Sequence, residues 1–145
     1  MKIKERTARM YDEGMTKTST TTLPQVSRGV AKLLELPLER HGRHRKNFAY
    51  VQSFNVSPMD MLKALEKATD TTKKDWKITE VPIEKAIAKG KEEFVKGGMG
   101  INVLYGANFK PGMGGCYEGK SSNNVLGLAE DDFEEVVRGL SGGQR

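Results

Sequence analysis

The chain has 145 residues, of which 37% are hydrophobic and 30% are charged, and its formal net charge is +5. This composition differs from that of a disordered chain, and the length is sufficient for one hydrophobic core. No apolar run approaches the roughly 18 residues of a membrane span, and the N-terminal residues 1–6 (MKIKER) lack the apolar stretch of a signal peptide. We therefore expect a cytoplasmic protein with no membrane partner.

A strand, a polar loop and a helix are predicted in the first quarter of the chain. Residues 7–11 alternate well enough to form a strand, and residues 16–22 are expected to form a polar loop. Thr22 is a plausible N-cap for a helix from about residue 24 to residue 34. The apolar face of this helix is expected to consist of Val26, Val30, Leu33 and Leu34.

The most informative stretch follows, because a strand leads directly into a capped helix. Aromatic and β-branched residues between positions 48 and 54 are typical of a buried strand. Ser57 then offers an N-cap, and Pro58 stands at the first helical position. A second strand is predicted over residues 76–81. Two strands joined by a helix predict a parallel β-α-β unit with a right-handed crossover, which is a partial Rossmann-type unit.

After residue 81, the chain is predicted to form helices separated by glycine-rich connections. A helix that follows Pro82 is expected to end near residues 97–98, and residues 101–109 form a loop or a short helix. A last helix is predicted over about residues 130–140, followed by a flexible tail at residues 141–145. The whole chain, residues 1–145, is thus predicted to be a single α/β domain with short parallel strands and about five helices.

One segment matches a phosphate-binding pattern. Residues 114–121 (GGCYEGKS) satisfy G-x-x-x-x-G-K-S, in which backbone amides and the lysine hold a triphosphate and the serine binds magnesium. A phosphate loop must follow a buried strand and open a helix, whereas residues 110–113 do not resemble a strand. An irregular surface loop is therefore favoured. A nucleoside-triphosphate-binding module that uses Gly114–Ser121 stays as the second alternative function.

A basic cluster at residues 40–46 (RHGRHRK) raises the question of nucleic-acid binding. The cluster contains no interleaved aromatic residue and no nucleic-acid module surrounds it, so a solvated turn is favoured over a nucleic acid partner. His41 and His44 are too few ligands for a catalytic zinc and stand among cations. The single Cys116 cannot form an internal disulfide. No metal site is predicted.

Several short motifs carry, by their order and spacing, a resemblance to a known family that covers most of the chain. They are Asp12-Glu13-Gly14, Thr20-Thr21-Thr22, the helix with Val26 and Val30, the strand from Trp76 to Pro82, and Asn124-Val125-Leu126-Gly127-Leu128. Together they resemble the C-terminal part of the NmrA-like (isoflavone reductase-like) family of atypical short-chain dehydrogenases. The resemblance implies the C-terminal, substrate-side portion of an NmrA-like fold.

The resemblance also implies an NAD(P)-dependent reductase of aromatic or small carbonyl compounds, and NADP(H) as the cofactor of a full-length family member. Family members carry a glycine-rich loop, G-x-x-G-x-x-G, after their first strand, and this chain has no such segment. No tyrosine stands four residues before a lysine, the pair in which ordinary short-chain dehydrogenases use the phenol as a general acid. We therefore expect a truncated reductase that is inactive alone, with no catalytic residue, no cofactor-binding residue and no cofactor of its own.

In the resembling enzymes, C-terminal helices and loops cover the substrate. Met99, Tyr105 and Phe109 supply the apolar and aromatic surface that lines small-molecule pockets, although such a stripe more often belongs to the core. Thr21 and Thr22 could edge the same pocket, though helix capping alone also accounts for them. These five residues are the substrate-pocket candidates for the small-molecule substrate of a complete enzyme.

Two further expectations concern protein partners. Some members of the resembling family act by sensing dinucleotide and holding a transcription factor, so a non-catalytic regulatory or protein-binding module is the first alternative function. Strands that normally lie inside a larger sheet would expose an unpaired edge and apolar faces. This predicts marginal stability or self-association through the exposed sheet edge.

Overall fold

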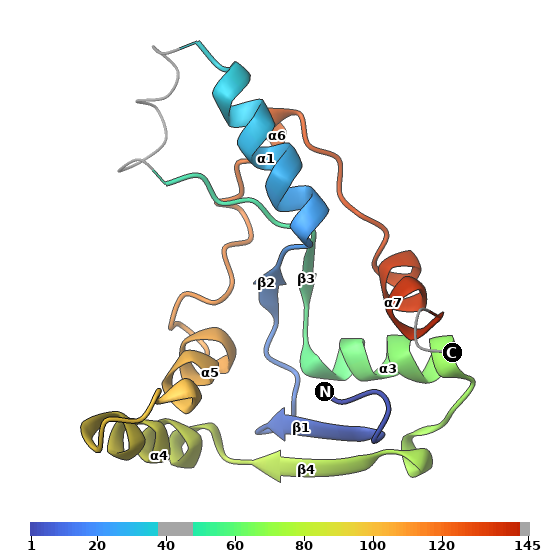
Figure 1. Ribbon diagram of the computed structural model, residues 1–145, viewed down its shortest axis with the longest axis vertical. Coiled ribbons are helices and arrows are strands. Elements are labelled where there is room, and N and C mark those ends of the chain that lie inside the picture. Colours follow the sequence, from blue (N-terminus) through green and yellow to red (C-terminus); the bar gives the residue numbers. More distant parts are fainter. Residues whose placement is uncertain (38–47, 143–145) are drawn as a thin grey trace.

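The computed structural model describes residues 1–37 and 48–142, which form a mixed α/β structure with a short parallel sheet and several helices (Figure 1). The strands are β1 (Thr7–Tyr11), β2 (Thr18–Thr20), β3 (Phe54–Val56) and β4 (Lys77–Val81). The α-helices are α1 (Leu23–Glu35), α3 (Pro58–Thr69), α4 (Ile83–Val95), α5 (Ile101–Phe109), α6 (Asn123–Leu126) and α7 (Phe133–Gly142). The basic cluster at residues 40–46 and residues 143–145 of the predicted tail lie outside the described residues, whereas residues 141–142 end α7.

β1 and β4 form the parallel pair that runs along the base of the molecule in Figure 1. The register places Thr7 opposite Lys77 and Tyr11 opposite Val81. α3 covers one side of β1 and α7 packs on α3, because burying each large apolar side chain there contributes about 1.5–3 kcal/mol. The buried residues of this main core are Ala8, Met10, Leu62, Leu65, Trp76 and Val137.

The predicted pairing of the β-α-β unit is wrong. β4 pairs with β1, and β3 pairs antiparallel with β2, so the strands on either side of α3 belong to different sheets. Residues 48–53, predicted as strand, lie outside the β2–β3 ladder, and side chains occupy two of their carbonyls. Thr21 Oγ1 donates to the carbonyl of Val51 at 2.7 Å, and Asn123 Nδ2 donates to the carbonyl of Gln52 at 2.7 Å.

The segment predicted as a polar loop also differs from the prediction, because β2 lies within it. The threonines of β2 are β-branched and suit a strand, and the ladder with β3 satisfies backbone groups that a loop would leave to water. Figure 1 shows this β2–β3 ladder standing across the β1–β4 pair, with α1 and α6 at its far end. The molecule therefore has two short sheets set at an angle.

The helix starts are the best-predicted local features. Thr22 Oγ1 accepts a hydrogen bond from Gln25 N at 3.2 Å and caps α1. At α3, Ser57 Oγ accepts from Asp60 N at 3.1 Å, and Asp60 Oδ2 accepts in return from Ser57 N at 2.9 Å. This reciprocal capping box satisfies two backbone donors that the helix leaves unpaired. The bond from the Ser57 backbone also holds the pKa of Asp60 below its ordinary value.

We predict that Ser57→Ala lowers the free energy of unfolding by about 1 kcal/mol, because the α3 cap is lost at a buried position. Urea denaturation followed by circular dichroism measures the difference. Ser27→Ala is the matched control, since the exposed Ser27 hydroxyl bonds only the carbonyl of Leu23 in its own helix. Equal stability of Ser57→Ala and Ser27→Ala would contradict the importance of the cap.

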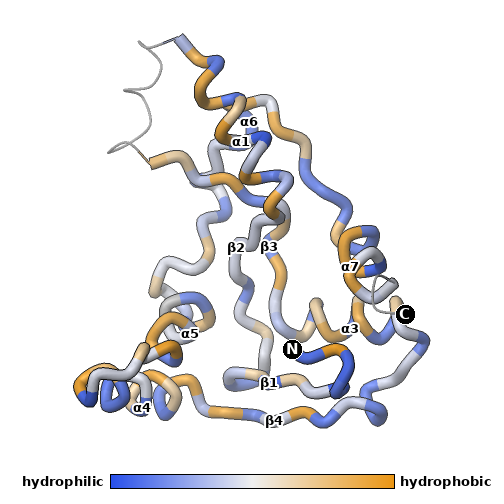
Figure 2. Tube along the Cα trace, viewed as in Figure 1, coloured by the Kyte–Doolittle hydropathy of each residue, from blue (hydrophilic) through white to orange (hydrophobic). Residues whose placement is uncertain are grey.

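Apolar side chains remain uncovered on several helices. Figure 2 shows apolar residues recurring along α1, where Leu23 and Leu34 are 83% and 74% exposed. Val26 and Val30, on the predicted apolar face of α1, are also exposed. Within the described residues, β4 has a hydrogen-bonded neighbour strand on one side only. Both features suit burial against another polypeptide.

We predict that the mass measured by sedimentation equilibrium rises with protein concentration, because association would bury these apolar residues. Leu34→Lys should shift the protein toward the monomer, since a lysine at this exposed α1 position resists burial. Lys32→Arg on the same helix serves as the control and should leave association unchanged. A mass that does not depend on concentration would sink this expectation.

Candidate functional site

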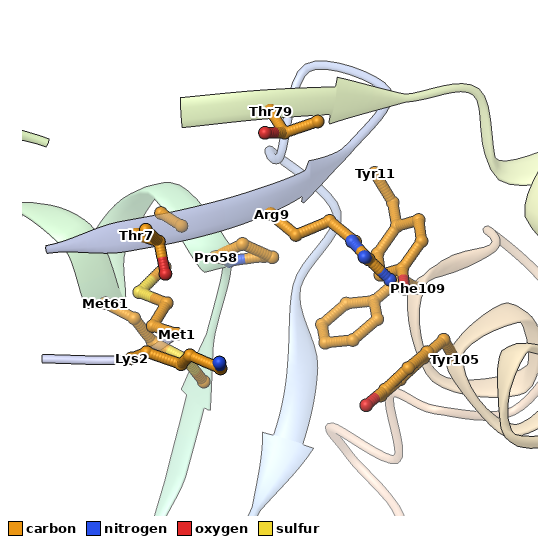
Figure 3. Close-up of a pocket in the computed structure, with 11 residues that line it drawn as sticks. Met1, Lys2, Thr7, Arg9, Tyr11, Pro58, Met61, Thr79, Tyr105 and Phe109 are labelled. Carbon is orange, nitrogen blue, oxygen red and sulfur yellow. The ribbon is translucent and has the colours of Figure 1, made fainter. Parts of the chain in front are cut away.

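A cavity of about 540 Å³ is lined by residues of both β1 and α5 (Figure 3). We call it the β1–α5 cavity. Alternation along β1 places Thr7, Arg9 and Tyr11 on one side of the strand. The lining residues come from the N-terminal segment, β1, α3, β4 and α5, and they are Met1, Lys2, Thr7, Ala8, Arg9, Tyr11, Pro58, Met61, Thr79, Tyr105 and Phe109.

Three aromatic rings form one wall of the β1–α5 cavity. The ring of Tyr11 stacks on Phe109 with a centroid distance of 5.6 Å and an angle of 20° between planes. Tyr105 lies at the same centroid distance from Tyr11, tilted by 34°. Both pairs lie in the range in which aromatic rings attract each other, typically by about 0.5–1.5 kcal/mol beyond burial. The wall thus joins the end of β1 to α5.

The position of α5 depends on two glycines at its contact with α4. A Cβ atom on Gly90 would lie 2.7 Å from the backbone nitrogen of Val103, and a Cβ atom on Gly106 would lie 2.3 Å from the Ile87 side chain. Both distances are too short for a carbon contact. Glycine at these positions therefore permits the close crossing that brings Tyr105 and Phe109 to the cavity.

Arg9 and Tyr11 give the cavity its polar chemistry. Tyr11 is only 7% exposed, and its hydroxyl lies beside the Arg9 guanidinium without a well-formed hydrogen bond to another described residue. Burial raises the pKa of Tyr11 above its ordinary value of 10.0, and the nearby Arg9 guanidinium offsets part of that rise. The phenol is therefore a neutral hydrogen-bond donor at physiological pH.

The five substrate-pocket candidates do not come together. Tyr105 and Phe109 line the β1–α5 cavity. Met99 is 85% exposed between α4 and α5, outside this cavity. Thr21 and Thr22 line a different cavity, described next.

The second cavity measures about 940 Å³ and lies between the start of α1, β2, α3 and α7. Most of its wall is apolar, including Phe54, Phe133 and Leu140. The hydroxyls of Thr21 and Thr22 are already engaged, by the Val51 carbonyl and by Asp131 respectively. These two threonines therefore serve the structure rather than presenting free polar groups to a ligand.

Sequence reasoning missed Arg9 and Tyr11. Both belong to the correctly predicted strand β1, and they stand two residues apart near its carboxyl end. The sequence did contain a signal for these two site residues. It places a cation and a phenol on one side of a strand, at the end where α/β proteins bind ligands. Their convergence with α5 could not be read from the sequence, because it depends on the packing of α4 against α5.

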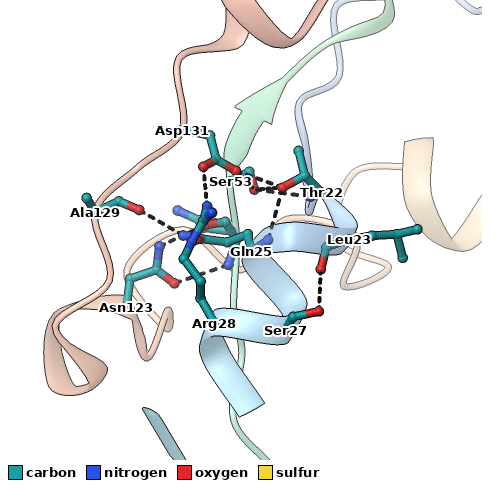
Figure 4. Close-up of polar contacts among 10 residues, drawn as sticks. Thr22, Leu23, Gln25, Ser27, Arg28, Ser53, Asn123, Ala129 and Asp131 are labelled. Atoms are coloured by element: carbon teal, nitrogen blue, oxygen red, sulfur yellow. Dashed lines mark hydrogen bonds and ion pairs between the residues drawn. The ribbon is translucent and has the colours of Figure 1, made fainter. Parts of the chain in front are cut away.

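A part-buried polar junction around Asp131 joins the start of α1 to residues 53 and 129–131 (Figure 4). Asp131 Oδ2 accepts hydrogen bonds from Thr22 Oγ1 at 2.8 Å and from Ser53 Oγ at 2.7 Å. Arg28 forms an ion pair with the other carboxylate oxygen, and Gln25 Nε2 donates to the carbonyl of Ala129 at 2.8 Å. Burial by itself would raise the pKa of Asp131, but the bonds from Ser53 and Thr22 and the charge of Arg28 hold it below its ordinary value.

The strand-to-helix turns of the described residues do not fit a dinucleotide. Such turns bind pyrophosphate when the helix N-terminus offers free backbone amides. Here each N-terminus has a carboxylate instead: Asp131 at α1, Asp60 on Ser57 N at α3, and Asp12, which accepts from Ile83 N at 3.0 Å, at α4. A pyrophosphate at any of the three would meet a negative charge already in place.

The phosphate-loop pattern and the single cysteine do not form a binding site in the structure. Residues 114–121 form an irregular, largely exposed segment between α5 and α6, which confirms the surface-loop interpretation. Cys116 within it is exposed. In residues 1–37 and 48–142 there is no group of three or more His, Cys, Asp or Glu side chains placed to hold a metal ion. No helix in those ranges has the length and apolar character needed to cross a membrane.

We predict that Asp131→Asn lowers the free energy of unfolding by about 2 kcal/mol at neutral pH, because part-buried hydroxyls and Arg28 lose their carboxylate partner. The folded-state pKa of Asp131 is lowered, so its contribution to stability is complete above the ordinary carboxyl range and is lost as pH falls through the folded pKa.

The free energies of unfolding of wild type and variant, measured by denaturation across this pH range, should therefore converge as the pH falls. Glu130→Gln, an exposed neighbour, is the control; a constant difference at every pH would contradict the assignment.

No family model matches the chain, and no curated protein or solved structure matches it significantly. The resemblance to NmrA-like proteins therefore rests on the residue motifs quoted above. The shape and chemistry of the β1–α5 cavity carry the functional interpretation.

Proposed function

We propose that this chain forms the substrate-side part of an NmrA-like, NADP(H)-dependent reductase of aromatic or small carbonyl compounds. Support comes from the order of the sequence motifs and from the mixed α/β structure with its parallel β1–β4 pair, which is compatible with a partial Rossmann-type unit. Asp12 of the first motif has a structural role that suits such a unit, since it caps α4 directly after β4.

The single observation that carries the proposal is the β1–α5 cavity. Ligands of open α/β sheets bind beyond the carboxyl ends of parallel strands, and Tyr11 is the last residue of β1. The volume of about 540 Å³ suits a small molecule with a ring, since ligand pockets measure roughly 300–1,000 Å³. Aromatic walls with few polar groups suit a planar, mostly apolar substrate.

The proposal assigns NADP(H) to polypeptide other than the described residues, because their strand-to-helix turns are closed by carboxylates. When bound there, the dinucleotide would supply a hydride. The residues of this chain would hold the substrate ring against Tyr105 and Phe109 and offer the Tyr11 hydroxyl to a substrate oxygen. This chain alone is therefore expected to be inactive.

A regulatory or protein-binding module is the second candidate function. The observation that favours it is the exposed apolar stripe of α1, where Leu23, Val26, Val30 and Leu34 follow helical spacing. The reductase proposal also accounts for the exposure of these apolar residues, if the unit that binds the cofactor covers this stripe in the complete enzyme. The two candidates differ in whether the β1–α5 cavity binds a small molecule.

Thermal-shift titration of the purified chain with acetophenone tests the proposal, since a ligand that binds only the folded form raises its melting temperature. Acetophenone should raise it for the wild type and not for Tyr105→Ala, which removes one wall of the cavity. Tyr50→Ala is the matched control, because Tyr50 packs on Tyr117 away from the cavity. NADPH alone should leave the melting temperature unchanged.

Two results would count against the proposal. An absent acetophenone shift in the wild type, or an equal shift in Tyr105→Ala, would remove the cavity as the substrate site and favour the protein-binding candidate. A shift with NADPH would show that this chain itself binds the cofactor, against the expectation that it is inactive alone.

A further inference from the structure

The charges around the β1–α5 cavity are one-sided. Arg9 and Lys2 are both among its lining residues, and none of the lining residues is acidic. Lys2 forms an ion pair with Glu5 at 3.1 Å, whereas Arg9 has no ion pair with any carboxylate in the described part of the chain. A guanidinium without a carboxylate partner at a cavity is an available site for an anion.

A second observation points to the same place. Tyr11 buries its hydroxyl beside the Arg9 guanidinium, which offsets part of the rise that burial causes in the pKa of the phenol, and no well-formed hydrogen bond joins this hydroxyl to another described residue. Figure 3 shows the Arg9 side chain extending along β1 toward the Tyr11 and Phe109 rings. Arg9 is exposed, so its side chain can shift to admit a ligand oxygen beside the phenol. Guanidinium and phenol would then donate to one anionic group.

We propose that the β1–α5 cavity recognises an aromatic carboxylate, with the carboxylate held by Arg9 and Tyr11 and the ring against Tyr105 and Phe109. The guanidinium favours a carboxylate, because its parallel N–H groups match the two carboxylate oxygens. The inference rests on the proposed function, because it names the class of carbonyl compound: one that carries a carboxylate on its ring.

Isothermal titration calorimetry with two matched ligands tests the inference at neutral pH. Acetophenone and 4-acetylbenzoate share the ring and the ketone, and only the second carries a carboxylate. The wild type should bind 4-acetylbenzoate at least about tenfold more tightly than acetophenone, as a charge-assisted pair requires. Arg9→Gln should abolish this preference for 4-acetylbenzoate over acetophenone.

Two further variants separate recognition from folding. Arg138→Gln removes an exposed arginine of α7 and should keep the preference for 4-acetylbenzoate. Tyr11→Phe keeps the stacked ring but removes the hydroxyl, so it should weaken 4-acetylbenzoate binding more than acetophenone binding.

The outcomes distinguish this inference from the proposed function. Equal affinity of the wild type for both ligands would overturn carboxylate recognition and leave the reductase proposal standing. A preference that survives in Arg9→Gln would place the anion elsewhere and overturn the inference. Failure of both ligands to bind would overturn both proposals.

Discussion

A carboxylate at the start of a helix is the interaction on which this fold depends. Asp131, Asp60 and Asp12 each meet the N-terminus of a different helix, where backbone donors lack partners and the helix dipole favours negative charge. The two ladders are short, so side chains must satisfy much of the remaining extended backbone. Asp60 and Asp12 do this where strands turn into helices, and Asp131 accepts from the Thr22 hydroxyl that caps α1.

The same carboxylates shape what the protein can bind. A Rossmann-type turn keeps its helix N-terminus open for pyrophosphate, whereas these turns are closed by aspartates of the chain itself. Binding capacity therefore concentrates at the β1–α5 cavity, where Gly90 and Gly106 let α5 approach and the aromatic wall forms. The helix starts and the cavity carry opposite charge: the side chains are negative at the three helix starts and positive around the cavity.

Local features were predictable from the sequence to the extent that they depend on neighbouring residues. The strand at residues 7–11 and the caps at Thr22 and Ser57 follow from alternation and capping chemistry, and the structure confirms them. Pairing was not predictable, because the partners of β3 and β4 are distant segments. Residues 48–53 have the composition of a strand, yet the side chains of Thr21 and Asn123 occupy the carbonyls of Val51 and Gln52.

The candidate site was predictable only in part. Tyr105 and Phe109 were identified by composition, which reports an aromatic surface but not the direction it faces. Arg9 and Tyr11 escaped notice because their role depends on the α4–α5 crossing. Met99 shares the composition of Tyr105 and Phe109 but lies exposed beyond the end of α4, so composition alone could not separate it from them.

The three aspartates also differ in how far along the chain they reach, which suggests an order of assembly. Asp60 bonds a residue three positions away, Asp12 spans 71 residues to Ile83, and Asp131 spans 109 residues to Thr22. Because the entropy lost in closing a loop grows with its length, we expect α3 to form first and the α1 junction last. Pulsed hydrogen exchange during refolding would contradict this order if the α1 amides became protected before those of α3. The cost of closing the loop is therefore smallest at the start of α3 and largest at the α1 junction.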